Sequence, residues 1–350
     1  MRSRILIPAL LVLGALLAAF ALYTRAASAP LFDEPRGPFA PRIAPLDEAL
    51  TFARSRDRLL LVTDQDDRVV RGRDLTARLG AERTADLLAL YRELGFDAIR
   101  ALRAPEVEVP LVELEPPVAY PGPHVAAGTN FKAHAEEVYL DDPPFLFPKL
   151  VDATGWNADV PYTDRLDYEA ELCMLPVDDI VSPEAEVEYA LVLCNDFTDR
   201  WTLVRDIDLS GPLGRTGFPT GKGCPGCLTT GYLVVIPKDP GFHRSLELRL
   251  FVDDALRQRF VMDQMILSID DIVAQAFAVA NDPFAYGDEF VSLLPTDRIP
   301  AGTLLLTGTA AGIAFKPVNI WSQRFYLQPG DVVRTEGRFL GHLENRVEAD

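Results

Sequence analysis

Residues 166–172 read LDYEAEL, a stretch with an acidic residue at every second position. Successive side chains of a β-strand point to opposite faces of the sheet. If the stretch is a strand, Asp167, Glu169 and Glu171 share one face, and the apolar and aromatic residues share the other. The acidic face is then either a solvated strand surface or a site for a hard divalent cation, because Mg²⁺ and Mn²⁺ prefer oxygen ligands.

A second apolar stretch, YALVLCNDF (189–197), favours the cation site. It is apolar on both faces until Asn195 and Asp196, which is the pattern of a buried strand. A carboxylate at the end of a buried strand must be paired, hydrogen-bonded or bound to a metal. Asp196 is therefore expected to be held in one of these three ways, and metal binding is one of them.

Residues 128–138, GTNFKAHAEEV, contain a candidate general base. On a helix, His134 and Glu137 would lie on one face within reach of each other. A carboxylate partner fixes the imidazole tautomer and raises its basicity, as activation of water requires. The alternative is a surface ion pair.

A Gly/Thr turn follows an apolar strand in LLLTGTAAG (304–312). Its backbone N–H groups and hydroxyls can hold a carboxylate, or the segment is a simple turn from strand to loop. A phosphate-binding loop is excluded because the Gly-Lys-Ser/Thr ending is missing.

The bulk composition indicates a globular protein: 350 residues, 48% of them hydrophobic, with a net charge of −18. That charge argues against nucleic acid as a partner, since phosphate binding needs a basic face.

The N-terminus predicts contact with a membrane. Arg2 and Arg4 precede an uncharged apolar run from Ile5 to Tyr23. The run is either an uncleaved signal anchor or a cleaved signal peptide, with a buried core helix as a third interpretation. In the first two cases residues 30–350 lie outside the cytoplasm, on the periplasmic side.

The chain has four cysteines, and a compartment outside the cytoplasm can oxidise their thiols to disulfides. Cys173 and Cys194 lie in apolar, strand-like stretches, so we expect buried free thiols. Cys224 and Cys227 form CPGC, which can be a redox centre, half of a zinc site, a local disulfide or two idle thiols. Without a second CxxC a four-cysteine zinc site is disfavoured, and the disulfide and the idle thiols stay open.

The chain divides into a leader (1–29), a small α+β lobe (30–119) and a strand-rich domain (120–350). In the lobe the pattern predicts a helix over 46–56, a strand over 58–64 and a helix over 82–102 interrupted near Gly95. Beyond residue 120, strands are expected at 188–197, 231–237, 245–254, 302–309 and 331–347. One helix is expected at 268–280, with Ser268 as its N-cap.

Taken in order, these pieces resemble the fumarylacetoacetate hydrolase (FAH) superfamily, from about Val118 to Val347. Besides GTNFKAHAEEV and LLLTGTAAG, the similar segments are PFLFPKL (144–150), DYEAEL (167–172), CNDFTDR (194–200), GKGCPG (221–226) and LQPGDVVRTEGRFLGHLENRV (327–347).

The resemblance implies an α+β, mostly β fold: an FAH-like mixed β-roll or β-sandwich catalytic domain after the small lobe, and a homodimer. It implies one cation, Mg²⁺ or else Mn²⁺ or Ca²⁺, bound by Glu169, Glu171 and Asp196. His134 and Glu137 become the water-activating pair and Lys222 the catalytic cation. Lys149, Arg200, Gly308 and Thr309 are expected on the substrate side, and Asp167 beside the ligands or on the surface.

The sequence departs from the family pattern around the substrate. RWTL follows where the family commonly shows Asp and then Gln, and the segment 202–220 is longer than usual. GTAAG lacks a Pro after its Thr, and FPKL has its Pro before the Lys. The residues implied for the metal site thus match the family pattern more closely than the residues implied for the substrate side.

The implied activity is hydrolysis of a C–C bond in an acylpyruvate-like or other 1,3-dicarbonyl acid, by activated water and a metal-stabilised enolate. Decarboxylation, isomerisation or hydration of a 2-oxo or dienoate acid at the same metal site is the alternative. A non-catalytic extracytoplasmic ligand-binding protein is another.

Overall fold

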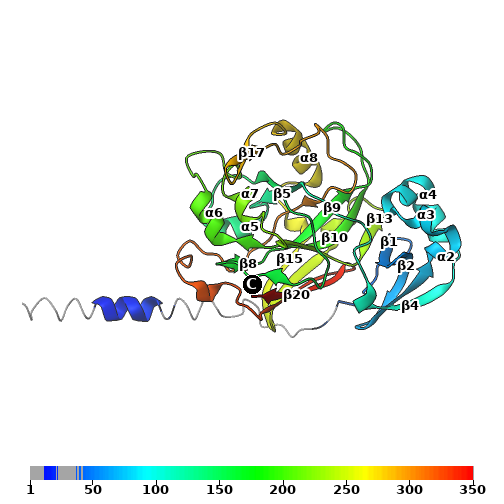
Figure 1. Cartoon of the computed structure of the whole chain (residues 1–350), viewed down its shortest axis with the longest axis horizontal. Coiled ribbons are helices and arrows are strands. Elements are labelled where there is room, and N and C mark those ends of the chain that lie inside the picture. Colours follow the sequence, from blue (N-terminus) through cyan, green and yellow to red (C-terminus); the bar gives the residue numbers. More distant parts are fainter. Residues whose placement is uncertain (1–11, 21, 23–36, 38, 41, 350) are drawn as a thin grey trace, which may run out of the picture.

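The computed structural model describes residues 12–20, 22, 37, 39, 40 and 42–349 (Figure 1). Residues 12–20 and 22 are helical. Within this described part, no helix combines the length and the apolar character needed to cross a membrane. Much of the apolar run 5–23 lies outside the described residues, so the membrane segment stays a prediction.

The largest sheet contains the predicted metal ligands Glu171 and Asp196. Within residues 42–349 it has eleven strands, which are, in sheet order, β4 (Glu106–Pro110), β3 (Val69–Asp74), β2 (Arg58–Gln65), β1 (Ala49–Ser55), β13 (Val234–Pro237), β10 (Tyr189–Asp196), β9 (Ala170–Pro176), β18 (Leu305–Leu306), β5 (His124–Gly128) and β6 (Phe145–Lys149), with β12 (Leu228–Thr230) paired to β10. Because β1 pairs with β13, the strands β1 to β4 extend the sheet that the later strands form.

A second sheet packs against the middle of the first. Its strands are β15 (Ala255–Val261), β14 (Glu247–Val252), β19 (Val332–Gly337), β20 (Gly341–Glu348) and β7 (Val160–Pro161). Of these, β14, β19 and β20 contact β9 or β10. Two ribbons complete the described strands: β8 (Leu166–Asp167) with β11 (Thr198–Asp199), and β16 (Phe284–Tyr286) with β17 (Glu289–Val291). The predicted mostly β, α+β fold is confirmed.

Within residues 42–349 the helices are α2 (Leu75–Leu79), α3 (Ala81–Thr84), α4 (Leu87–Ala101), α5 (Lys132–Glu137), α6 (Arg200–Asp206), α7 (Phe218–Gly221) and α8 (Ile269–Ala278), with 3₁₀ turns η1 (Leu111–Glu113), η2 (Phe242–Ser245), η3 (Met262–Gln264) and η4 (Gln323–Phe325). In Figure 1, α2, α3 and α4 lie beside the end of the large sheet that contains β1, β2 and β4. Two predictions are confirmed here: Gly95 has non-helical angles inside α4, and Ser268 caps α8 in a capping box with Asp271.

The helix predicted for residues 46–56 is wrong, because that segment forms β1. Phe52 and its neighbour Ala53 are both fully buried, so side chains on opposite sides of the strand are covered. A run that is apolar on every side cannot be assigned to helix or strand by its period. Pairing with β2 on one edge and β13 on the other decides for the strand.

The acidic stretch is a strand with a break. Leu166–Asp167 form β8 and Ala170–Pro176 form β9, while Tyr168 and Glu169 connect them. Antiparallel pairing places Glu171 opposite Cys194 on β10. Beyond the ladder, the Asp196 N–H donates to the Glu169 carbonyl oxygen at 2.9 Å. Strand β10 therefore brings its terminal carboxylate to the acidic face.

The prediction of free thiols at Cys173 and Cys194 is wrong: they form a disulfide with their Cα atoms 6.0 Å apart. The residues stand on neighbouring strands in a diagonal position, since Cys173 lies opposite Val192 and Cys194 opposite Glu171. Cys224 and Cys227 also form a disulfide, which settles the alternative left open for CPGC.

A buried histidine makes the stability depend on pH. Burial, followed by the charge of Lys149, lowers the pKa of His124 from 6.5 to about 4. The unfolded chain therefore binds the proton more readily, so wild-type stability should fall as the pH drops from about 6.5 to 4, by up to about 1.4 kcal/mol per pH unit. His124→Asn keeps an acceptor for the Leu304 N–H and cannot titrate. Urea unfolding should show a shallower pH slope for this variant, and equal slopes would contradict the assignment.

Candidate active site

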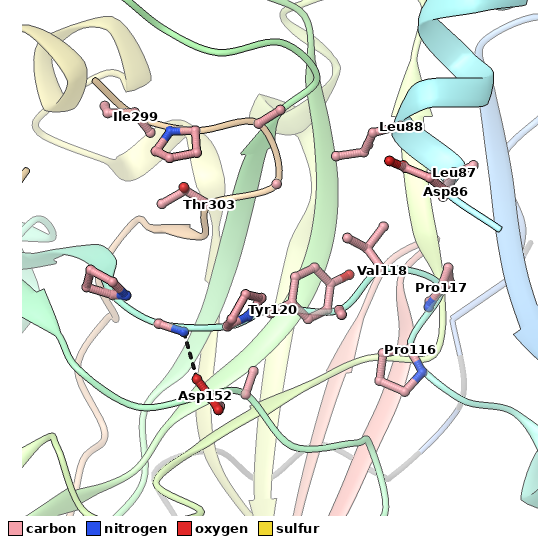
Figure 2. A pocket seen from close by; sticks show the side chains of 18 of the residues that line it. Asp86, Leu87, Leu88, Pro116, Pro117, Val118, Tyr120, Asp152, Ile299 and Thr303 are labelled. Atoms are coloured by element: carbon pink, nitrogen blue, oxygen red, sulfur yellow. Dashed lines mark hydrogen bonds between the residues drawn. The ribbon is translucent and has the colours of Figure 1, made fainter. Parts of the chain in front are cut away.

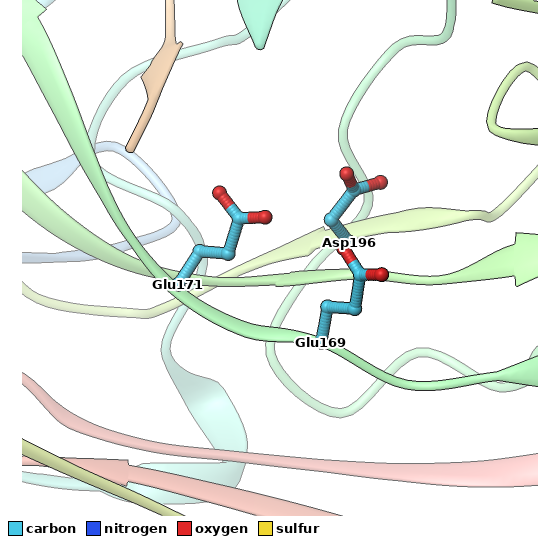
Figure 3. Close-up of side chains that lie close together, drawn as sticks. All are labelled: Glu169, Glu171 and Asp196. Carbon is cyan, nitrogen blue, oxygen red and sulfur yellow. The ribbon is translucent and has the colours of Figure 1, made fainter. Parts of the chain in front are cut away.

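Three carboxylates lie close together where the start of β9 pairs with the end of β10 (Figure 3). Glu169 precedes β9, Glu171 lies on it and Asp196 ends β10. One carboxylate oxygen from each lies within 4.8 Å of the others, and all three side chains are buried. The solvated-surface interpretation of the acidic face is therefore wrong, and the three predicted ligands are brought together.

Lys222 neutralises two of these carboxylates. Its Nζ donates to Glu169 Oε2 at 2.6 Å and to Asp196 Oδ2 at 2.7 Å. Burial acts to raise the pKa of Glu169, but the charges of Lys222 and Arg200 outweigh it and hold that pKa at about 2. Glu169 is thus fixed as an anion.

Lys149 holds Asp196 from the other side. Its Nζ donates to Asp196 Oδ1 at 2.6 Å and to the carbonyl oxygens of Cys227 and Phe197 at 2.7 and 3.3 Å. The side chain is 0% exposed. Lys149 therefore faces the carboxylate cluster rather than an open cavity, and we assign it to positioning Asp196.

Arg200 bridges two acidic residues. Its Nε donates to Asp167 Oδ2 at 2.8 Å, and its Nη2 donates to Glu169 Oε1. Asp167 is fully buried and also accepts the backbone N–H groups of Ala314 and Phe315 at 2.8 and 3.1 Å. Of the two positions predicted for Asp167, the one beside the predicted metal ligands is therefore correct. Through its hydrogen bonds Asp167 also links the 312–316 loop to Arg200.

Glu171 has no such cation in the described part of the chain. Its Oε2 accepts the Gly308 N–H at 2.8 Å. Burial, together with the negative charges of Asp196 and Glu169, raises the pKa of Glu171 well above its ordinary value. The cluster thus lacks positive charge at this carboxylate, and its donor set of carboxylate oxygens fits Mg²⁺, Mn²⁺ or Ca²⁺.

The Gly/Thr turn closes over the cluster. Gly308 has φ +84°, and a Cβ there would stand 2.9 Å from the Ala127 carbonyl oxygen, so only glycine fits. The Thr309 hydroxyl donates to the Ala170 carbonyl oxygen and accepts from Gln258, at 2.8 and 2.9 Å. The predicted substrate groups at 308 and 309 are thus already hydrogen-bonded within the protein.

His134 and Glu137 lie on α5, as the spacing predicts. His134 Nδ1 stands 3.6 Å from Glu137 Oε2, and both side chains are mostly buried. Glu137 also accepts the Gly312 N–H at 3.0 and 3.1 Å and a hydrogen bond from Lys316 Nζ. Burial acts to raise the pKa of Glu137, but His134 and Lys316 outweigh it and lower that pKa.

A cavity of about 270 Å³ opens onto the cluster. Of the predicted residues, those lining it are His134, Glu169, Arg200, Lys222 and Thr309. Its other walls are mainly apolar side chains from the residues just after α5, from α6 and the residues after it, from α7 and from the loop after residue 312. His134, the two cations Arg200 and Lys222, and the Glu169 carboxylate thus face one small cavity.

A second cavity, of about 1440 Å³, lies where α4 meets the 115–123 and 293–303 segments (Figure 2). Tyr120 and Val118 line it together with Leu87 and Leu88. It contains none of the predicted site residues.

Sequence reasoning did not assign Lys316 and Gln258, which hold Glu137 and Thr309. Lys316 is one of only five lysines in the sequence, and this scarcity was the one feature that could have marked it as a functional residue. Gln258 lies on a strand with alternating burial and carried no signal of its own.

The two glutamates differ in their charge balance, and this predicts different effects of their substitution on the stability of the metal-free protein. Glu169→Gln should lower the free energy of unfolding by about 3–5 kcal/mol, because Lys222 and Arg200 lose a buried partner. Glu171→Gln is the matched control, where burial already opposes the charge, and stability should stay within about 1 kcal/mol or rise. Urea unfolding in a chelator measures both. Equal losses would contradict this charge balance.

Comparison with known proteins agrees with this geometry. An uncharacterized protein of Staphylococcus aureus strain USA300 is 27% identical over 285 residues, covering 78% of this chain and 85% of the relative. A probable 2-hydroxyhepta-2,4-diene-1,7-dioate isomerase from Mycobacterium abscessus has a similar structure: TM-score 0.60, 22% identity, 86% of this chain and 98% of that chain.

The fumarylacetoacetate hydrolase of Exiguobacterium antarcticum is similar as well, with TM-score 0.56, 21% identity, and coverage of 87% of this chain and 99% of that chain. At these identities the structural likeness shows the fold. The model of the fumarylacetoacetate (FAA) hydrolase C-terminal family matches residues 123–348. The match spans more than half of the sequence, and the chain therefore belongs to the FAA hydrolase family.

Proposed function

We propose that the protein is a divalent-metal-dependent hydrolase that cleaves a C–C bond in acylpyruvate-like or other 1,3-dicarbonyl acids. The observation that carries the proposal is that a histidine with a carboxylate partner faces the same cavity as the ligand carboxylate Glu169. Membership of the FAA hydrolase family, whose members are hydrolases or isomerases, supports an enzyme of this kind.

The cation site would be formed by Glu169, Glu171 and Asp196. A bound Mg²⁺ or Mn²⁺ would act as a Lewis acid toward the substrate's adjacent oxygens. The raised pKa of Glu171, caused by burial and by its acidic neighbours, supports the assignment, because a divalent cation would supply the charge that this carboxylate lacks.

His134 would act as the general base. Glu137, whose Oε2 stands 3.6 Å from His134 Nδ1, would orient the imidazole, and Glu137 is itself held by Lys316 and by the Gly312 backbone. His134 takes a proton from water, and the oxygen attacks the acyl carbonyl carbon. The C–C bond then breaks, its electron pair stays on the carbon of the pyruvate fragment, and that carbon takes up a proton.

Lys222 and Arg200 would stabilise negative charge as the bond breaks. Both line the cavity, and both are kept charged by buried carboxylates. Preorganised cations of this kind act most strongly where water is excluded. Thr309, also on the cavity wall, would contact the substrate, while Lys149 and Gly308 would position Asp196 and Glu171.

The proposal places the enzyme outside the cytoplasm, attached by residues 5–23 or released after cleavage, and as a homodimer. The arginines before the apolar run and two disulfides support an oxidising location. A reporter fused after residue 350 should be active outside the cytoplasm, and activity confined to the cytoplasm would contradict this location.

The role of His134 is tested by turnover. A panel of 2,4-dioxo and 2-oxo acids, with and without Mg²⁺ or Mn²⁺, should identify a substrate hydrolysed only with metal. His134→Ala should then lower kcat roughly 10²–10⁴-fold, the usual contribution of a general base, while metal binding stays unchanged.

Lys132→Ala is the control, because this residue lies on the same helix with an exposed side chain. It should leave turnover unchanged. Hydrolysis that survives His134→Ala would contradict the base assignment, and metal-dependent loss of CO₂ without water attack would point to a decarboxylase.

A further inference from the structure

We propose that the enzyme selects substrates whose acyl tail is apolar, an alkyl or aryl group without a charged end, and that α6 and α7 form the selecting wall. The inference rests on the proposed function and names the substrate class of the same cavity. It follows from two observations, one about the charges that face the cavity and one about its wall.

The cavity offers no unused cation for a second carboxylate. Among the described residues that line it, the cationic side chains are Arg200 and Lys222. Arg200 is bound to Asp167 and Glu169, and Lys222 to Glu169 and Asp196. A carboxylate at the far end of the tail would be taken from water without a partner, which is unfavourable.

The wall away from the carboxylates is apolar and retains exposed surface. Leu203 and Ile207 come from α6 and its C-terminal end, and Phe218 begins α7. Val138 and Ile320 line the cavity as well. Ile207, Phe218 and Val138 are only partly buried, unlike residues of the core, so apolar surface remains available to a ligand.

The helices that form the wall are held in place by a helix cap and by close packing. Asp199 caps α6 by accepting the Thr202 N–H at 2.9 Å. A Cβ at Gly217, where φ is +74°, would stand 2.5 Å from the Leu203 carbonyl oxygen, and one at Gly221 would stand 2.6 Å from Leu203 Cβ. Two glycines thus let α7 pack directly against α6. The segment 202–220 that departs from the family pattern contains most of this wall.

For a tail that fills the cavity, the favourable binding free energy grows in proportion to the apolar area buried, so affinity rises roughly fourfold with each methylene. Replacing its terminal methyl by a carboxylate loses that gain and adds the cost of an unpaired charge. The cavity of about 270 Å³ is near the lower end of small-molecule sites, which favours a short tail.

The test compares two acids of equal length with Mn²⁺ present: 2,4-dioxooctanoate and 2,4-dioxooctanedioate. They differ only in a terminal methyl or carboxylate. Hydrolysis consumes one water and gives pyruvate with valerate or glutarate. We expect kcat/KM to be at least about tenfold higher for the alkyl acid. Equal rates, or a preference for the diacid, would overturn the substrate class and leave the hydrolase standing.

Ile207→Lys places a cation in the wall. It should reverse the preference by lowering kcat/KM for the alkyl acid and raising it for the diacid. Val181→Lys is the matched control, since Val181 is 66% exposed and lies outside the cavity lining. It should leave the preference unchanged, and an unchanged preference in Ile207→Lys would contradict the role of the wall.

Binding separates this inference from the proposed function. If neither acid is hydrolysed, calorimetry with Mn²⁺ still compares their affinities. Tighter binding of the alkyl acid would then support the apolar wall while refuting hydrolysis of these acids. Equal or absent binding of both would refute both proposals.

Discussion

The antiparallel pairing of β9 with β10 is the constraint on which the rest of the site depends. Its register sets Cys194 opposite Glu171, and the hydrogen bond from the Asp196 N–H to the Glu169 carbonyl oxygen continues it past the strand end. Three carboxylates are thereby fixed in the interior, two of them next to the Cys173–Cys194 disulfide that joins the same strands. Buried anions require compensation, and the surrounding structure supplies most of it.

The compensating cations come from elements far apart in the chain. Lys149 ends β6, Arg200 begins α6 and Lys222 follows α7. Burial acts to lower the pKa of Lys222, but Asp196 and Glu169 outweigh it and raise that pKa, so the ammonium stays charged. Among the three carboxylates, and within the described residues, the charge balance is incomplete at Glu171, where burial and the acidic neighbours oppose the negative charge. Such a local conflict with stability is typical of a functional site, and a divalent cation would resolve it.

Local patterns predicted two parts of the site, and the family resemblance supplied the cations Lys149, Arg200 and Lys222. Alternation along LDYEAEL predicted the shared face of Glu169 and Glu171, and a spacing of three predicted the approach of His134 to Glu137. Long-range register was not accessible to such patterns. The Cys173–Cys194 disulfide spans 21 residues and depends on strand pairing, and Asp167 is held by Ala314 from 147 residues away. The helix predicted over 46–56 failed for the same reason, because pairing on both edges decided for β1.

The central claim is that the three carboxylates bind one divalent cation, and calorimetric titration of Mn²⁺ into metal-free protein tests it most directly. The account predicts one ion per wild-type chain and a large loss of affinity in Glu171→Gln, a substitution that leaves the ion pairs of Lys149, Lys222 and Arg200 in place. Equal binding by the two proteins, or no binding by either, would contradict it.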